Sequence, residues 1–291
     1  MRPRAPYGFE YARIAVPELA PAQEFYEYVV GLTPVDVEPG RVTLRADIDH
    51  HCIELREDRS LSEMEVLALG FSAESAEHLE DLRSRLTGAG YPVLPIDDAM
   101  RPVITDGFAT TDPNGIRLEF VHEFQVFAEP PFVEIRPVDI VHPFLGTPEF
   151  EKSLAFYTEV LGFLPSDFIA FRSAFLRGED RYHHSIALRL ADKVEVAHIC
   201  FMMKSFDHVM RGFAKARYKK IPCPSGLVNH SASRSIAFYM EVPRFGPPIE
   251  LCDGHVVFTP EQHETHVPRR MSADPRNIDV WRAAADDWGL T

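Results

Sequence analysis

The sequence contains few cysteines, and their positions form no recognisable pattern. Cys52, Cys200, Cys223 and Cys252 are far apart and include no Cys-x-x-Cys pair. This spacing argues against a zinc ribbon and against a disulfide framework. Scattered cysteines of this kind are usually buried thiols of the core, so we expect them to be reduced and the protein to be cytoplasmic.

Basic residues are scarce relative to acidic ones. Lys and Arg total 30 against 44 Asp and Glu, which gives a net charge of -14. Such a charge makes nucleic acid and membrane surfaces unfavourable partners. No apolar run reaches the roughly 18 residues needed to span a membrane, and residues 1–12 lack the apolar core of a signal peptide. With 291 residues, 45% of them apolar, the chain is expected to form one large or two medium domains.

What the sequence does contain is an internal repeat. Residues 29–32 (Val-Val-Gly-Leu) end a helical stretch, and residues 160–163 (Val-Leu-Gly-Phe) end a matching stretch 131 positions later. Three further landmarks recur in the same order at offsets of 130 to 133, including the His-His pairs at residues 50–51 and 183–184. We interpret the chain as two homologous halves joined near the proline-rich residues 129–137.

Each half divides again into two units of one kind. A short strand pattern, as in residues 138–144 or 194–202, precedes a helix and several short β-type runs. One helix is expected to have Thr147 as N-cap and Pro148 at N1, and another to cover residues 75–86. A third is expected to begin at Ser205, with one face formed by Phe206, Val209, Met210 and Phe213. We predict an α+β fold of four βαβββ modules, paired into two consecutive curved-sheet barrel domains; helices are too few for a doubly wound α/β fold.

Three residues in predicted strands of the second half are candidate metal ligands. They are His142, His198 and Glu250. Side chains on the same face of neighbouring strands can converge inside a curved sheet. Two imidazoles and one carboxylate on one side of an ion leave other positions open, which suits a non-haem Fe(II).

The repeat provides an internal control for this assignment. The first half has Tyr11 in place of His142 and Ala68 in place of His198. The fold therefore does not require the two histidines, which favours a functional role for them. Glu119 occupies the position of Glu250, so a structural role for that glutamate stays open. We expect residues 1–130 to form a domain without metal and residues 131–291 to form the catalytic domain with the metal site and a C-terminal tail.

At these residues the sequence resembles the vicinal oxygen chelate (glyoxalase/bleomycin resistance/dioxygenase) superfamily, and within it the two-domain type I extradiol ring-cleavage dioxygenases. The likeness extends from about Phe9 to Asp253. It implies that His142, His198 and Glu250 hold Fe(II), with Mn(II) as the alternative, and that O2 is the co-substrate. It also implies that the substrate is a small aromatic diol of the catechol type and that the protein is a homo-oligomer.

A second set of matches carries the resemblance further. The family's His-His-Ser motif appears at residues 183–185, which puts His184 in the catalytic place, and His230 stands nine residues before the matching Tyr239. The resemblance assigns acid–base chemistry to His184, and hydrogen bonding of the substrate oxygens to His230 and Tyr239. The residues alone leave ordinary alternatives open: a strand-end feature for His184, a solvated loop for His230 and core packing for Tyr239.

Several expectations concern the surroundings of the site. The family often has an acidic residue where this chain has Ser233, and the turn at residues 241–248 is one residue longer than usual. The histidines after the last strand, His255, His263 and His266, are expected at the surface. Four phenylalanines either line a pocket for an aromatic ring or fill the barrel: Phe168, Phe171, Phe175 and Phe201.

Two other functions remain open from the sequence. A metal-dependent lyase, isomerase or hydroquinone dioxygenase would use the same three ligands without His230 and Tyr239. A non-catalytic binding protein would hold a small apolar molecule without any metal. The sequence does not specify which catechol is used.

Overall fold

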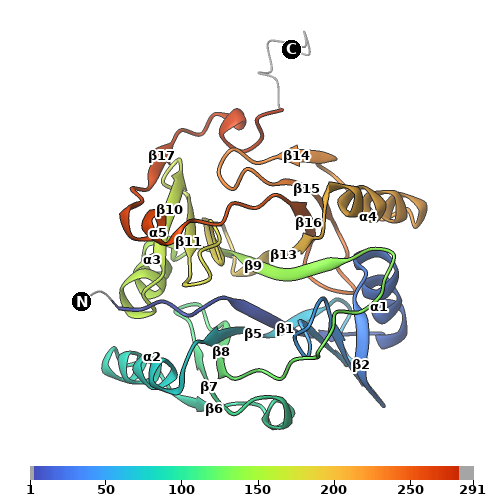
Figure 1. Ribbon diagram of the computed structural model, residues 1–291, viewed down its shortest axis with the longest axis horizontal. Coiled ribbons are helices and arrows are strands. Elements are labelled where there is room, and N and C mark those ends of the chain that lie inside the picture. The colour runs from blue at the N-terminus through green and yellow to red at the C-terminus, as the bar shows by residue number, and fades with distance from the viewer. Residues whose placement is uncertain (1–2, 282–291) are drawn as a thin grey trace.

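The computed structural model describes residues 3–281, and its first half consists of two βαβββ modules (Figure 1). In the first, a π-helical turn (Tyr26–Val30) extends the helix. Its elements are β1 (Phe9–Val16), α1 (Leu19–Phe25), β2 (Thr33–Glu38), β3 (Arg41–Arg45) and β4 (Ile53–Glu57). The second has a 3-10 turn (Arg101–Val103) between the strand that follows its helix and the next strand. Its elements are β5 (Glu65–Ala73), α2 (Ala76–Gly88), β6 (Leu94–Pro95), β7 (Asp106–Thr111) and β8 (Arg117–His122).

The second half repeats this order and adds a tail. Its first module again contains a π-helical turn (Phe156–Val160) after the helix. The elements are β9 (Pro137–Thr147), α3 (Phe150–Ala155), β10 (Leu164–Ile169), β11 (Ser173–Arg177) and β12 (Ile186–Leu190). The last module comprises β13 (Glu195–Met203), α4 (Phe206–Tyr218), β14 (Leu227–Asn229), β15 (Ile236–Met240) and β16 (Ile249–Asp253). The tail contains α5 (Pro260–Thr265), β17 (Arg269–Met271) and a 3-10 turn (Pro275–Asn277).

Within the described residues the strands form two sheets, one per half. The order is β2-β3-β4-β1-β5-β8-β7-β6 in the first and β14-β15-β16-β13-β9-β12-β11-β10-β17 in the second. In each sheet the two modules join through an antiparallel pair, β1 with β5 and β9 with β13. The predicted fold class, four paired βαβββ modules, is therefore confirmed. Figure 1 shows β1 and β9 next to each other where the two sheets meet.

The repeated glycines have a structural reason. Gly31 directly follows the first π-helical turn and Gly162 follows Leu161, the C-cap of the second. Their φ angles of 92° and 85° are left-handed, a conformation that favours glycine. A Cβ atom on Gly31 would also collide with the backbone carbonyl of Ile135 at the start of the second half. The two halves thus pack closely at these turns, and one cluster of buried apolar side chains extends through both.

The longer helices follow their apolar spacing. Helix α2 buries Leu79, Leu82 and Leu86, three positions at helical intervals, and the Ser75 hydroxyl caps its N-terminus by accepting from the His78 amide. Helix α4 begins after Ser205 as predicted, but its buried face is formed by Val209, Gly212 and Ala216. The predicted face was partly wrong, since Phe206 is exposed at the first helical position.

The predicted start of α3 was also wrong. Strand β9 continues to Thr147, and the helix begins at Phe150 with Glu149 as N-cap. The Thr147 hydroxyl accepts from the Glu149 amide at 2.9 Å and donates to Asn114 Oδ1 at 2.6 Å. Thr147 therefore stabilises a turn between strand and helix and anchors it to the first half.

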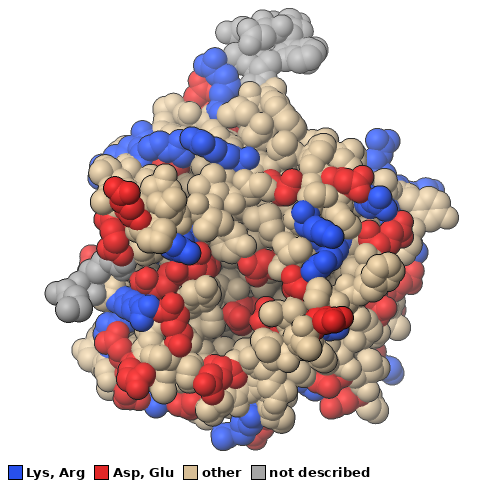
Figure 2. Space-filling view, viewed as in Figure 1, with Lys and Arg blue, Asp and Glu red and all other residues tan. Residues whose placement is uncertain are grey.

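Two surface features complete the description. In the described part of the chain, no helix has both the length and the hydropathy required to cross a bilayer. Figure 2 shows basic and acidic side chains interspersed on one face, with acidic side chains around a hollow between the two sheets.

Candidate metal centre and active site

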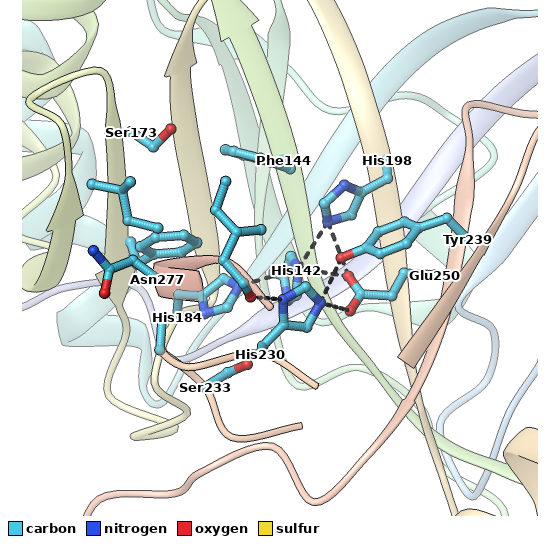
Figure 3. A pocket seen from close by; sticks show the side chains of 14 residues that line it. His142, Phe144, Ser173, His184, His198, His230, Ser233, Tyr239, Glu250 and Asn277 are labelled. Atoms are coloured by element: carbon cyan, nitrogen blue, oxygen red, sulfur yellow. Dashed lines mark hydrogen bonds and ion pairs between the residues drawn. The ribbon is translucent and has the colours of Figure 1, made fainter. Parts of the chain in front are cut away.

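Adjacent strands of the second sheet position the predicted site residues. His142 lies on β9, His198 on β13, Glu250 on β16 and Tyr239 on β15, four consecutive strands of the sheet. In register, Cys200 is opposite both His142 and Glu250, and Tyr239 is opposite Glu250. The concave face of the curved sheet therefore directs these side chains to one point, as Figure 3 shows.

The distances within the predicted triad fit a metal ion. His142 Nε2 lies 3.2 Å from His198 Nε2 and 3.5 Å from Glu250 Oε2, and His198 Nε2 lies 3.0 Å from the same oxygen. Ligand atoms bonded at roughly 2.1 Å and at right angles are about 3.0 Å apart. All three residues are buried. Two imidazole nitrogens and one carboxylate oxygen on one side of an ion form the facial arrangement typical of non-haem Fe(II) sites.

The electrostatics keep these groups ready to bind a cation. Burial lowers the pKa of His142 to about 4, so its imidazole is neutral. Burial alone would raise the pKa of Glu250, but hydrogen bonds from His142, His198 and His230 hold it well below its ordinary value. The carboxylate is therefore ionised, and neutral imidazole with ionised carboxylate is the donor set that a divalent metal needs.

His230 and Tyr239 lie together on the other side of Glu250. The Tyr239 hydroxyl is 2.8 Å from His230 Nε2, which is 3.4 Å from Glu250 Oε1. Burial and the Glu250 charge raise the pKa of Tyr239 well above its ordinary value, so its hydroxyl keeps its proton. Burial opposes charge on His230, but Glu250 more than offsets this and raises the pKa of its imidazole. The pair presents hydrogen-bonding groups beside the triad.

His184 lies two residues before β12 and contacts the triad through His142. Its Nε2 is 3.2 Å from His142 Nε2, and its ring packs against Phe175 with centroids 5.0 Å apart. Burial, reinforced by the neighbouring His142 and His255, lowers the pKa of His184 well below its ordinary value. His184 is therefore a neutral imidazole facing the triad.

A small, partly open cavity adjoins these residues. Its volume is about 140 Å³, and a cavity of roughly 150 Å³ is known to accommodate benzene. Phe144, Ile169 and Phe175 give it an apolar wall opposite the polar groups. The arrangement of one apolar wall and convergent polar groups suits a small aromatic molecule.

At the corresponding position of the first half, a buried arginine contacts the equivalent glutamate. Arg13 Nη1 is 2.8 Å from Glu119 Oε1, and Arg13 Nε is 3.2 Å from Glu54 Oε1. The Tyr11 hydroxyl donates to Glu119 Oε2 at 2.8 Å. Glu119 thus neutralises a buried guanidinium, which explains why the glutamate persists in the half without the two histidines.

The tail contributes residues that the sequence did not indicate. Asn277 and Ile278 line the cavity, and His230 Nδ1 is 3.2 Å from the Ile278 carbonyl oxygen. The expected surface position was wrong for His255 and His263, which are 6% and 4% exposed. After β16 the chain returns against residues 181–183, where Val257 pairs with Tyr182 and the His183 amide donates to the Val256 carbonyl oxygen. Arg177 Nη2 donates to the His263 carbonyl oxygen at 2.7 Å.

The remaining expectations concern the phenylalanines, Ser233 and the long turn at residues 241–248. Phe175 lines the cavity, Phe201 is fully buried in the core, and Phe171 is 65% exposed. Ser233 also lines the cavity, with its hydroxyl 2.9 Å from that of Ser235. The long turn lies away from the cavity, with the Phe245 ring packed on Phe25 of the first half.

His255 is the most informative of the residues missed. Its ring centroid lies 4.6 Å from that of His184 and 5.6 Å from that of His142. Ligand atoms of these three histidines lie within 4.8 Å of one another, so they form a second, overlapping group of potential metal ligands among the described residues.

Comparison with known proteins identifies the family. The model of the Glyoxalase/Bleomycin resistance protein/Dioxygenase superfamily matches residues 8–120 and 139–239, and the chain belongs to this superfamily. The chain is 26% identical to the biphenyl-2,3-diol 1,2-dioxygenase of Paraburkholderia xenovorans (strain LB400), an alignment that covers 80% of this chain and 83% of the relative. It is 27% identical to the iron-dependent extradiol dioxygenase of Rhodococcus jostii (strain RHA1), over 73% of this chain and 75% of that one.

Structural comparison agrees with this placement. The Mn(II)-bound glyoxalase from Novosphingobium aromaticivorans superimposes with a TM-score of 0.84 and 25% identity, covering 95% of this chain and 91% of the other. The predicted superfamily is thus confirmed. The predicted enzyme class is confirmed as well, because both of these relatives are dioxygenases.

Proposed function

We propose that this protein is an extradiol ring-cleaving dioxygenase that inserts both atoms of O2 into a small catechol-type substrate. The observation that carries the proposal is the triad His142, His198 and Glu250 beside a partly open cavity of about 140 Å³. Support comes from relatives of the same superfamily that are extradiol dioxygenases. Fe(II) is the proposed metal and Mn(II) the alternative.

In this proposal, His142, His198 and Glu250 are the metal ligands. The bound ion would supply Lewis-acid and redox chemistry, and would hold the diol and O2 together. The three residues occupy one side of the site, so the positions facing the cavity remain for the two reactants. The apolar wall of Phe144 and Phe175 excludes water from the aromatic ring.

The remaining polar residues handle protons and orientation. Tyr239 and His230, 2.8 Å apart, are placed to hydrogen-bond the diol oxygens and fix their position. His184 is a neutral imidazole on the opposite side of the triad, suited to accept and return one proton during the reaction. The product would be a ring-opened semialdehyde or the related 2-hydroxy-6-oxo dienoate.

Three broader expectations belong to the same proposal. Residues 1–130 form a domain without metal, and residues 131–291 form the catalytic domain. The protein is proposed to be a homo-oligomer. Cytoplasmic location is proposed because the cysteines are free thiols, as expected in a reducing compartment.

Metal content and oxygen consumption test the proposal together. The chain is reconstituted anaerobically with Fe(II) or Mn(II) and given monocyclic, biphenyl-type and carboxylated catechols under air. We expect close to one metal per chain, oxygen uptake and a yellow ring-opened product. H184Q should slow turnover while the metal stays bound, and H51Q, the matching change in the first half, should leave turnover unchanged.

The possible failures separate the rival functions. A chain that binds neither metal after reconstitution would support a non-catalytic binding protein. A metal-loaded chain that consumes no oxygen with any catechol would support a lyase or isomerase, and the glyoxalase-like neighbour makes this the stronger alternative.

A further inference from the structure

A chain of buried hydrogen bonds leads from His184 to the protein surface. His184 Nδ1 is 3.0 Å from His183 Nδ1, and His183 Nε2 is 2.8 Å from Asp167 Oδ2. Asp167 is held in turn by Arg269, whose Nε donates to Asp167 Oδ1 at 2.8 Å and whose Nη2 pairs with Oδ2. The sequence placed His184 in the site but gave no role to His183, Asp167 or Arg269.

The charge state of each member can be stated. Burial would raise the pKa of Asp167, but hydrogen bonds from His183 and Arg269 hold it below its ordinary value, so the carboxylate is ionised. Burial lowers the pKa of His183, and Asp167 offsets this only in part, so His183 is neutral. His183 therefore has a single N–H hydrogen to place.

An ionised carboxylate can only accept, which fixes the hydrogens along the chain. His183 must donate from Nε2 to Asp167, so its Nδ1 has a lone pair and no hydrogen. His184 Nδ1 must then be the donor to His183 Nδ1. A neutral His184 with hydrogen on Nδ1 has a lone pair on Nε2, the nitrogen that faces His142 and the cavity.

We infer that Asp167 and His183 are positioning residues that fix the tautomer of His184, so that His184 presents a hydrogen-bond acceptor to the cavity. The inference rests on the proposed function only for its effect on turnover. A diol carries two hydroxyl hydrogens, and an acceptor at this place can take one of them, whereas the opposite tautomer cannot.

The first half contains the same pattern in a looser form. His50 Nδ1 is 3.0 Å from His51 Nδ1, but His50 Nε2 is 3.7 Å from Asp36 Oδ2. The Asp36 side chain is 42% exposed and accepts from the Thr43 hydroxyl, whereas the Asp167 side chain is fully buried. At these matched positions the contact is 2.8 Å in the second half and 3.7 Å in the first, so Asp36 offers a matched control.

The test variant is D167N, which keeps the shape of the side chain and removes its charge. The amide oxygen is expected to replace Oδ1 against Arg269, which turns the amide N–H toward His183 and reverses both tautomers. In the Ser-His-Asp proteases the equivalent change preserves the geometry and lowers kcat by roughly 10⁴-fold through the wrong tautomer. D36N is the control in the first half.

Two readouts are measured. Histidine ¹⁵N spectra of the protein, metal-free and with diamagnetic Zn(II), report which nitrogen of His184 carries hydrogen; the signals are assigned by their loss in H184Q. Catechol turnover of the Fe(II)-loaded variants reports kcat and KM separately. We expect hydrogen on Nδ1 in the parent and on Nε2 in D167N, a fall in kcat of roughly 10²- to 10⁴-fold with KM and metal content little changed, and no effect of D36N.

The outcomes separate this inference from the proposed function. Hydrogen on His184 Nε2 in the parent protein would overturn the inference, even if D167N proves unstable. An unchanged tautomer and kcat in D167N would overturn it as well, as would an equal loss of kcat in D36N. If the spectra show the expected tautomers but no catechol is turned over, the proposed function has failed while the tautomer assignment stands.

Discussion

The two halves use equivalent glutamates for different purposes, so the same substitution should have different consequences in each. Glu119 is fully buried and pairs with Arg13 at 2.8 Å, whereas Glu250 contacts His142, His198 and His230. E119Q removes the charge that neutralises a buried guanidinium. E250Q removes the anionic member of the proposed ligand set.

The expected magnitudes follow from these contacts. Removing one partner of a buried ion pair costs about 3–5 kcal/mol, and Arg13 keeps Glu54 and Asp97, so we expect E119Q to cost about 3 kcal/mol. For a chain of this size that lowers Tm by roughly 6–12 °C. Changes to groups that only support metal ligands cost about 10- to 100-fold in affinity, so loss of a ligand in E250Q should cost at least about 100-fold.

The assays are thermal unfolding of the metal-free proteins by circular dichroism and metal content after dialysis against a fixed low concentration of Fe(II). We expect E119Q to lose stability and keep its metal, and E250Q to lose its metal. An E250Q protein that retains stoichiometric iron would refute the ligand assignment. An E119Q protein as stable as the parent would refute the ionic account of the first half.

Three further predictions can be checked with the same protein. Y239F should retain metal and lose roughly 10-fold or more in kcat/KM for catechols, measured by oxygen uptake, because it removes the hydroxyl 2.8 Å from His230. Burial raises the pKa values of Glu10, Asp139 and Asp180 to about 8, 7 and 8. The folded state therefore binds more protons than the unfolded state, and the free energy of unfolding falls as pH rises from about 5 to 8. D180N should show a weaker fall in Tm over this range. Fe(II) at about 100 times its Kd should stabilise the chain by about 2.7 kcal/mol, and a chelator should reverse this shift in Tm.

Much of the fold could be predicted because it depends on local patterns. The repeat offsets placed equivalent strands correctly: Tyr11 lies opposite Gly70 on β5, just as His142 lies opposite Cys200 on β13. The helices after Ser75 and Ser205 begin where predicted, and the Ser75 hydroxyl makes the capping hydrogen bond that Ser205 does not make. Thr147 misled because its hydroxyl serves a turn and a contact with Asn114 in the other half, which no local pattern reveals.

The site could be predicted where the repeat supplied a comparison and not where it depended on distant contacts. The absence of His142 and His198 equivalents from the first half indicated that the fold does not need them. His255 has no such comparison, and it is buried where the chain after β16 returns against Tyr182 and His183. Asp167 lies far from the His-His pair in sequence, so its contact with His183 becomes visible only in three dimensions.

The location of the bound metal tests the central claim most directly. Crystals of the Fe(II)-loaded protein, with diffraction recorded on both sides of the iron absorption edge, would place the ion without reference to activity. We predict one anomalous peak within roughly 2.2 Å of His142 Nε2, His198 Nε2 and a Glu250 carboxylate oxygen. A peak held instead by His142, His184 and His255, or no peak in the second half, would contradict the account.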